Sequence, residues 1–179
     1  MTTQTFEITE GTHIVVAECR GNLTVESGDE GALIVKTPGP EEEAVIVQED
    51  GALVIETYGN CRLTCPGNVD LTLKAVRGNL KLDGVGGDLI IDTVNGNATL
   101  SDIGSLTLQR VYGNLRVENA EENVAVTSVA GNARIKNVAG EVSIGSVGGD
   151  LRAEGLAQGL ALEGAGADVR LGPPFAPDM

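Results

Sequence analysis

The sequence predicts an all-β fold: a parallel β-solenoid (β-helix) with coils of about 18 residues, each made of two nine-residue units. Three observations predict it. A Gly-Asn/Asp-apolar triplet recurs every nine residues from Gly78 onward, with a single interval of eight. Apolar residues alternate inside each unit, as in a strand with one buried face. The 25 glycines, spaced in this way, disfavour helix.

The repeat unit is close to G-N-L-x-L-x-x-V-x. Positions 3 and 5 are predicted strand residues that point inward, and the Gly-Asn/Asp pair supplies a bend. A glycine loop that binds phosphate would occur once, whereas this triplet occurs in unit after unit, so it is a structural repeat. The eleven units begin at Gly78, Gly87, Gly96, Gly104, Gly113, Glu122, Gly131, Gly140, Gly149, Gln158 and Ala167.

Alternate units differ at position 4, which predicts two chemically distinct outer faces. Equivalent residues of successive coils stack directly in a parallel solenoid, so each face should carry a column of like residues. Asn79, Asn97, Asn114 and Asn132, continued by Asp150 and Asp168, should form a ladder at the turn. The odd units place Lys81, Thr99, Arg116, Arg134, Arg152 and Arg170 at position 4. The even units place Ile90, Thr107, Ala125, Ser143 and Ala161 there.

The chain is expected to form one structural domain with three parts. Residues 1–58 are a strand-rich N-terminal cap that merges into the solenoid, residues 59–172 are the solenoid, and residues 173–179 are a Pro-rich C-terminal stop whose Phe175 covers the last core layer. The cap strands are expected in "THIVVAEC", "NLTVES", "GALIVKT", "AVIVQ" and "GALVIET", with "TPGPEEE" (37–43) as an acidic surface loop.

The formal charge of −14 argues against nucleic acid and anionic membrane surfaces as partners, because both are polyanions. No stretch approaches 18 apolar residues, so we expect no direct membrane insertion. The beginning of the sequence has neither the basic nor the apolar region of a secretory signal. Three cysteines do not form a disulfide framework. A cytoplasmic location is the expectation, with the cell surface left open for a processed N-terminus.

The chain resembles the DUF4097 family of adhesin-like proteins. The resemblance is carried by "TFEITEGTHIVVAECRGNLTVES", by "GALVIET", and by the transition "LTCPGNVDLTLKAVRGNLKLDGVGGDL" into Gly-Asn and Gly-Asp triplets. The sequence is also similar to head-GIN adhesin-like proteins and, more loosely, to bactofilins. The resemblance covers nearly the whole chain. It implies a β-helix with structural, surface or assembly roles and no established catalytic residues.

Two outer faces are candidate interaction surfaces. The basic face of Lys81, Arg116, Arg134, Arg152 and Arg170 could bind carboxylates or an anionic polymer. Alternatively, Asp83, Glu118 and Glu154, two residues along the same strands, make it an ordinary ladder of paired charges, which is the favoured interpretation. The face of Ile90, Thr107, Ala125, Ser143 and Ala161 either packs against another copy or is simply solvated, and the sequence does not favour one over the other.

The sequence gives little support for a metal-binding or catalytic site. The G-G-x-G-x-D signature of calcium-binding nine-residue repeats is absent. Cys19, Cys61, Cys65 and the single His13 are numerically enough for zinc, but buried reduced cysteines are favoured over zinc or a Cys61–Cys65 disulfide. His13 lies in an apolar strand, where a structural role is favoured over general-base work, and no G-x-S-x-G occurs. We therefore predict no catalytic residue, no bound metal and no cofactor.

These observations together favour a non-enzymatic structural scaffold that self-assembles through its ends or through the small-residue face. Its partner would then be another copy of itself, in an oligomer or polymer. The alternative is an adhesin-like binding module that recognises a polymer or protein partner through the ladder of arginine and glutamate. Paired-carboxylate hydrolysis is the remaining class, and tight coils without long loops disfavour it.

Overall fold

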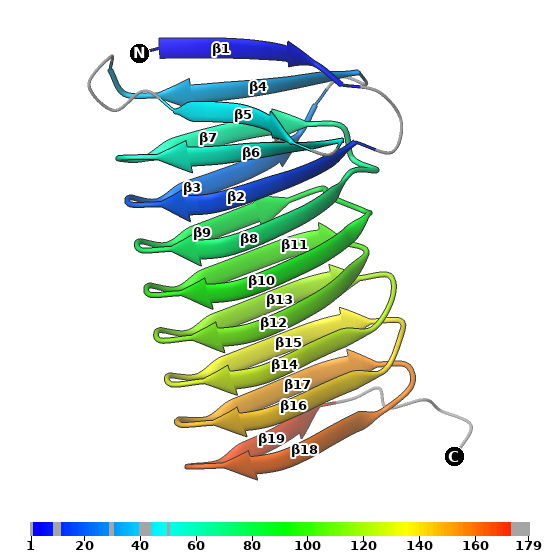
Figure 1. The fold of residues 1–179 in the computed structure, drawn as a ribbon. Coiled ribbons are helices and arrows are strands. Elements are labelled where there is room, and N and C mark those ends of the chain that lie inside the picture. Colours follow the sequence, from blue (N-terminus) through cyan, green and yellow to red (C-terminus); the bar gives the residue numbers. More distant parts are fainter. Residues whose placement is uncertain (1, 9–11, 29–30, 40–43, 50, 173–179) are drawn as a thin grey trace.

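The computed structural model describes residues 2–8, 12–28, 31–39, 44–49 and 51–172, which form two facing β-sheets wound into a solenoid (Figure 1). The ten-stranded sheet A contains, in spatial order, β1 (Thr2–Glu7), β4 (Ala32–Thr37), β7 (Cys61–Cys65), β3 (Leu23–Ser27), β9 (Leu80–Asp83), β11 (Ala98–Ile103), β13 (Leu115–Ala120), β15 (Ala133–Val138), β17 (Leu151–Leu156) and β19 (Val169–Gly172). The nine-stranded sheet B contains β18 (Leu160–Ala165), β16 (Val142–Val147), β14 (Val124–Val129), β12 (Ser105–Val111), β10 (Asp88–Val94), β8 (Asp70–Val76), β2 (His13–Cys19), β6 (Ala52–Thr57) and β5 (Val45–Glu49).

The parallel β-solenoid with two strands per coil is confirmed. From β8 onward, each strand pairs in parallel with the strand two elements along the chain. Equivalent residues lie 18 positions apart in most coils, as in the pair of Leu71 and Leu89. The pair of Leu89 and Leu106 is separated by 17 residues, because the one eight-residue unit lies between them. The period read from the sequence therefore sets the register.

The first coils do not follow the order of the chain. Strands β2 and β3 form a coil that lies between the coil of β6 and β7 and the coil of β8 and β9. Along the chain, the inner coil of β2 and β3 therefore comes first. It is followed by β4 and β5, and then by the outer coil of β6 and β7. All five strands predicted before residue 58 are present, as β2 to β6, and β1 precedes them.

Antiparallel strands cover the N-terminal end of the solenoid. In sheet A, β4 pairs antiparallel with β7, and β1 pairs antiparallel with β4. In sheet B, β5 pairs antiparallel with β6. These strands cover the first coil, whose edges would otherwise expose unpaired backbone groups at this end. The predicted acidic loop and the Pro-rich stop with Phe175 lie wholly or partly outside the described residues.

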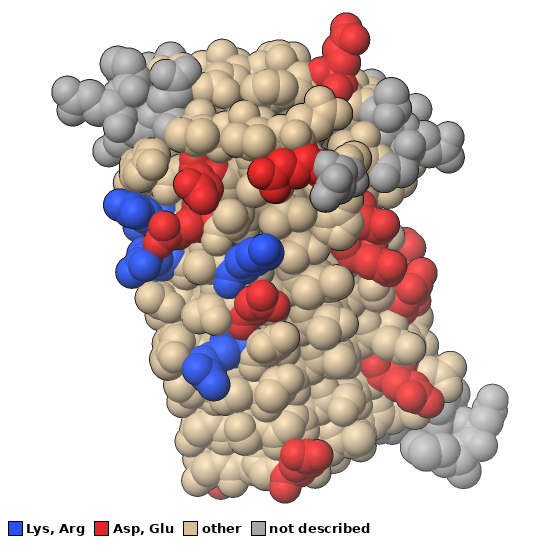
Figure 2. Space-filling view, in the orientation of Figure 1, with Lys and Arg blue, Asp and Glu red and all other residues tan. Residues whose placement is uncertain are grey.

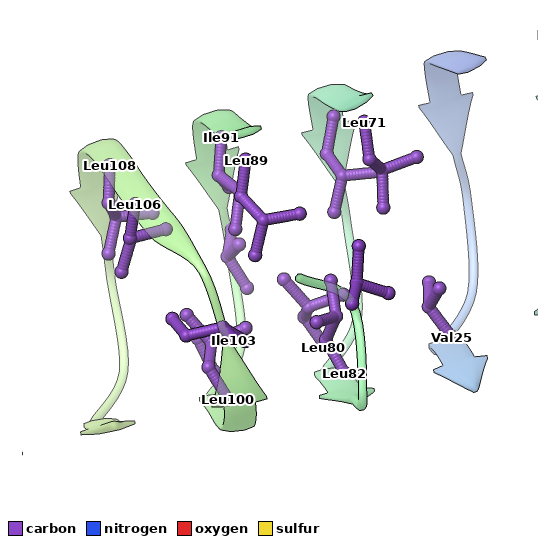
Figure 3. Packing of buried hydrophobic residues seen from close by; sticks show 14 of the residues in the cluster. Val25, Leu71, Leu80, Leu82, Leu89, Ile91, Leu100, Ile103, Leu106 and Leu108 are labelled. Atoms are coloured by element: carbon purple, nitrogen blue, oxygen red, sulfur yellow. The ribbon is translucent and has the colours of Figure 1, made fainter. Parts of the chain in front are cut away.

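A narrow apolar core fills the space between the two sheets (Figure 3). The inward positions of the repeat are buried in coil after coil, as with Leu80, Leu100 and Val117 in sheet A. Leu89, Ile91 and Leu108 face them from sheet B. In the described repeat region the buried core residues are all aliphatic, and residues of similar shape pack on one another from coil to coil.

The predicted asparagine ladder is present at the turn from sheet B to sheet A. The Oδ1 atom of Asn97, for example, accepts a hydrogen bond from the backbone N–H of Asn114 at 2.8 Å. The ladder also includes Asn22 and Asn60 of the N-terminal coils, with Asn22 N–H donating to Asn60 Oδ1 at 2.8 Å. The glycine before each rung gives the coils room to approach: a Cβ on Gly113 would lie 2.4 Å from Asn97 Oδ1.

A second ladder lies at the end of the sheet A strands, where the chain turns back toward sheet B. Asp102, Asn119 and Asn137 have φ angles of 50°, 57° and 56°, a region in which Asn and Asp are tolerated better than most residues. Asn119 Nδ2 donates to Asp102 Oδ1 at 3.0 Å, and Asn137 Nδ2 donates to Asn119 Oδ1 at 3.1 Å. These side chains therefore stabilise the bends of successive coils by the same stacking principle.

Candidate interaction faces

The basic residues of the odd units form one column on the outer surface of sheet A. Arg116, Arg134, Arg152 and Arg170 are direct neighbours on adjacent strands. The column continues past the repeat to the N-terminal end, where Lys36 faces Arg62 across β4 and β7. It contains seven of the 12 lysines and arginines of the chain. In spatial order, this basic column is Lys36, Arg62, Thr24, Lys81, Thr99, Arg116, Arg134, Arg152 and Arg170.

Part of the basic column is paired with carboxylates on the same strand. Arg116 Nε donates to Glu118 Oε1 at 2.9 Å, and Arg152 Nε donates to Glu154 Oε1 at 2.6 Å. The hydrogen bond from Arg116 lowers the pKa of the Glu118 carboxyl. Within the part of the chain that the structure describes, Lys81 and Arg134 have no ion-pair partner, and the Nε atom of Arg134 is buried without a hydrogen bond.

A cavity of about 430 Å³ lies where the basic column reaches the N-terminal end of sheet A. Six polar residues contribute to its wall together with Pro38 and Cys61: Asn22, Thr24, Lys36, Thr37, Asn60 and Arg62. Arg62 is exposed and its guanidinium lies 3.9 Å from Glu26, a loose contact between two solvent-exposed side chains. Lys36 is half-buried and, among the described residues, forms no ion pair.

The small residues of the even units form the corresponding column on sheet B. Ile90, Thr107, Ala125, Ser143 and Ala161 are exposed and are paired neighbour to neighbour. Figure 2, in which sheet B faces the viewer, shows wide areas of uncharged surface between scattered basic and acidic side chains. The uncharged column extends to the N-terminal end, and its full spatial order is Val47, Val54, Val15, Thr72, Ile90, Thr107, Ala125, Ser143 and Ala161.

The C-terminal end of the described solenoid differs from every other coil. Strands β18 and β19 each pair with one neighbour only, so their outer edges are unpaired among the described residues. Val169 and Leu171 occupy inward positions of the repeat, yet they are 41% and 53% exposed. The equivalent Leu151 and Ala153, one coil earlier, are 0% exposed. Among the described residues, no strand covers the outer side of this last core layer.

Two of the cysteine and histidine residues touch these surfaces: Cys61 lines the cavity, and His13 contacts Thr72 of the uncharged column. Cys19, Cys61 and Cys65 are buried and free, and burial raises the pKa of the Cys61 thiol to about 12 and that of Cys65 to about 11. The Nε2 atom of His13 lies 2.6 Å from the hydroxyl of Thr72, within hydrogen-bond distance. No group of three or more metal-ligating side chains occurs within the described ranges. These ranges also contain no helix that is long and apolar enough to cross a membrane.

Two cations of the basic column lie outside the repeat. Lys36 and Arg62 join it only because β7 pairs with β3, and β4 pairs with β7. For Arg62 a sequence signal existed, because Gly59-Asn60 precedes it as Gly-Asn precedes the repeat strands β9, β11, β13 and β15. Lys36 lies on an antiparallel strand without that triplet, so the repeat carries no information on its position.

Comparison with solved structures finds proteins of similar length. A proposed adhesin from Bacteroides fragilis NCTC 9343 has 16% sequence identity and a TM-score of 0.48, with 96% of this chain and 95% of that chain covered. A proposed cell adhesion protein from Clostridium sporogenes ATCC 15579 has 11% identity and a TM-score of 0.43, with 96% and 98% covered. A proposed lipid-binding protein from Parabacteroides distasonis ATCC 8503 has 12% identity and a TM-score of 0.32, with 95% and 96% covered. No curated protein sequence matches the chain significantly.

The family model described as Toastrack DUF4097 matches residues 3–171. That match spans the N-terminal cap strands and all the coils, so it includes the segments on which the resemblance was based. The chain therefore belongs to the DUF4097 (Toastrack) family.

Proposed function

We propose that the protein is a non-enzymatic structural scaffold that associates with a second copy of itself through the C-terminal end of its solenoid. The observation that carries the proposal is the exposure of Val169 and Leu171 at positions that are fully buried one coil earlier. Leaving such an apolar layer and two strand edges uncovered is unfavourable, because both apolar surface and unpaired backbone groups favour pairing with another chain.

The difference between the two ends favours a tail-to-tail dimer over a filament. A filament needs the C-terminal end of one copy to fit the N-terminal end of the next. The outermost strands at that N-terminal end are β1 and β5, and β5 runs antiparallel to the coil beneath it. Two C-terminal ends, in contrast, are identical and can pair across a two-fold axis, which is the commonest symmetry of soluble oligomers.

The test is the molar mass of the full chain, measured by size-exclusion chromatography with light scattering over a concentration series. The wild-type protein is expected to shift from monomer to dimer as its concentration rises. The double variant Val169→Asp with Leu171→Asp is expected to stay monomeric, because each carboxylate would lose its hydration in the interface. Circular dichroism and urea unfolding of the monomeric variant check that the preceding coils remain folded.

A matched control separates the end from the lateral face. The double variant Ala125→Glu with Ser143→Glu places charges on the uncharged column of sheet B and is expected to dimerise like the wild type. Loss of the dimer in this variant, with dimerisation intact in the Val169 and Leu171 variant, would contradict end-to-end association and favour lateral packing. A truncated variant that ends at Gly172 is a further test of the proposal. If it dimerises while the full chain remains monomeric, residues 173–179 cover the end and the proposal fails.

A second candidate function is an adhesin-like binding module that recognises an anionic polymer or protein partner through the basic column. The observation that favours it is the alignment of seven cations on one face of a chain whose net charge is −14. Binding assays against an anionic glycan panel test it, with Arg134→Glu plus Arg152→Glu as the disrupting variant. Affinity should fall in that variant while folding is retained, and equal affinity in the two proteins would contradict this role.

A further inference from the structure

We infer that the cavity at the N-terminal end of the basic column is a binding site for a small oxyanion-bearing ligand, one that carries a carboxylate or a phosphate group. The inference rests on the second candidate function, that the basic column binds anions, and specifies where on that column the contact is made. It does not depend on self-association, because the cavity lies at the end of the solenoid opposite to β18 and β19 (Figure 1).

Two cations from different strands meet at this cavity. Lys36 on β4 and Arg62 on β7 are direct cross-strand partners, and Thr24 on β3 is the neighbour of Arg62 on the other side. Adjacent strands are about 4.8 Å apart, so an ammonium, a guanidinium and a hydroxyl can contact the oxygens of one carboxylate or phosphate group. A planar guanidinium can bind two oxygens at once, and the ammonium adds a point charge.

The asparagines beside these cations present donors and not acceptors. The Oδ1 atom of Asn60 accepts from the backbone N–H of Asn22, and Asn22 Oδ1 accepts from the backbone N–H of Asn79, both at 2.8 Å. Each ladder bond fixes the orientation of one amide, and the two Nδ2 groups are the hydrogen-bond donors that these side chains can offer an anion.

No aspartate or glutamate belongs to the described wall of the cavity, although the chain has 26 acidic residues and only 12 basic ones. Among the described residues, Glu26 contacts Arg62, and at 3.9 Å between exposed groups this ion pair adds little stability. The two cations of the described wall therefore oppose the net charge of the whole protein. The net charge of the chain repels an anion, and Lys36 and Arg62 supply the local attraction that offsets this repulsion.

The dimensions favour a compact ligand over an extended one at this position. A volume of about 430 Å³ lies in the lower part of the range of small-molecule sites, which spans roughly 300–1,000 Å³. That volume accommodates one sugar acid or one phosphate ester. The rest of the basic column remains free to contact a longer polymer of which such a group is the end.

The experiment is a titration of the ¹⁵N-labelled full chain, followed by the shifts of backbone amide signals. The probes are inorganic phosphate and D-glucuronate, and neutral D-glucose is the control for the sugar body. We expect saturable shifts at Thr24, Lys36 and Arg62 with at least one anion and none with glucose. Response to phosphate alone or glucuronate alone identifies which oxyanion the site prefers. Shifts that follow only the ionic strength, without saturation, would overturn the inference.

Variants separate this site from the rest of the column. Lys36→Gln and Arg62→Gln each remove one charge from partly exposed positions and should weaken anion binding by about tenfold or more. Lys74→Gln with Arg110→Gln removes two exposed charges from sheet B, outside the basic column, and should leave the affinity within about twofold of the wild type. Loss of binding in Arg134→Gln with Arg152→Gln, without loss in Lys36→Gln or Arg62→Gln, would overturn the cavity while leaving the function of the basic column intact. No binding of either anion to the wild type would count against both.

Discussion

The two ends of the solenoid meet the same physical problem in different ways. At the N-terminal end, β4 and β5 turn antiparallel to the coil beneath them, and core residues such as Leu33 and Ile55 are fully buried. At the C-terminal end, β18 and β19 keep the parallel repeat up to the last described residue, and Val169 and Leu171 are exposed. A repeat has no internal reason to stop, so an end is closed only where the sequence departs from the repeat.

The irregular N-terminal segment and the repetitive segment therefore have different roles in this chain. The irregular N-terminal segment supplies a cover, displaces the first coil from chain order, and brings Lys36 beside Arg62. The regular segment supplies long uniform columns, but its last layer has no further strand beside it among the described residues. Substitutions of the same chemistry at the two ends should therefore have different consequences for stability and for association.

The largest expected difference is in the loss of core side chains. Leu33→Ala, at a position that is 0% exposed in β4, should lower the free energy of unfolding by about 2–5 kcal/mol. Leu171→Ala should lower it by about 1 kcal/mol or less in dilute monomer, because half of that side chain is already in contact with water. Urea unfolding measures both. Equal losses for the two variants would contradict the open C-terminal end.

Glycine substitutions should show the next largest contrast. A Cβ on Gly113 would lie 2.4 Å from Asn97 Oδ1 and 2.7 Å from Gly96 O, so Gly113→Ala should cost about 1–3 kcal/mol. Gly164 in β18 has nothing within 4 Å of the corresponding position. Gly164→Ala should be neutral or stabilise by up to about 1 kcal/mol. Thermal unfolding of both variants checks the pair, and a destabilised Gly164→Ala protein would show that another surface covers β18.

The asparagine ladder should contribute less per rung. Asn114 Oδ1 accepts from the N–H of Asn132 at 2.8 Å, so Asn114→Ala should cost about 1 kcal/mol. Asp168 is the last described rung: its N–H donates to Asp150, and its carboxylate lies 3.8 Å from Arg170 at the surface. Asp168→Ala should change the free energy of unfolding by about 0.5 kcal/mol or less. An equal cost at both positions, measured in urea, would argue against coil-to-coil stacking as the source.

The stability of the fold should depend little on pH near neutrality. Its decline at alkaline pH should arise from buried thiols near the N-terminal end. Burial raises the pKa of Cys61 to about 12 and that of Cys65 to about 11, above the ordinary value of 9.0. The contribution of these thiols to stability is fully present below about pH 9 and is lost as the pH rises toward the folded values, because only the unfolded state releases the protons. Melting temperatures from pH 7 to about pH 11 measure the slope. The variant Cys61→Ala with Cys65→Ala should show a shallower alkaline decline, and an unchanged slope would exclude the thiols as its cause.

The sequence was most informative where one period governs both the strand and its neighbour. The inward columns, the basic column from Lys81 to Arg170 and the ladder from Asn79 to Asp168 all follow from spacing, since a stacked coil places residues 18 apart side by side. The one eight-residue unit was visible in the sequence, and it accounts for the pairs separated by 17 residues. Fold class was accessible for the same reason.

The nine-residue period does not predict the order of the first coils. The pairing of β3 with both β7 and β9 joins segments separated by unequal stretches of chain, and no spacing rule distinguishes it from pairing in chain order. The triplets at Gly21-Asn22 and Gly59-Asn60 indicate ladder rungs but not which rung is outermost. The cavity formed by Lys36 and Arg62 depends on that order, so it was not predicted.

The measurement that tests the central claim most directly is amide hydrogen exchange of the full chain, followed by mass spectrometry from micromolar to millimolar concentration. Association through the C-terminal end predicts that protection of β18 and β19 rises with concentration while that of β1 and β5 stays constant. Protection that is independent of concentration at both ends, or that rises at β1 and β5 instead, would contradict the account.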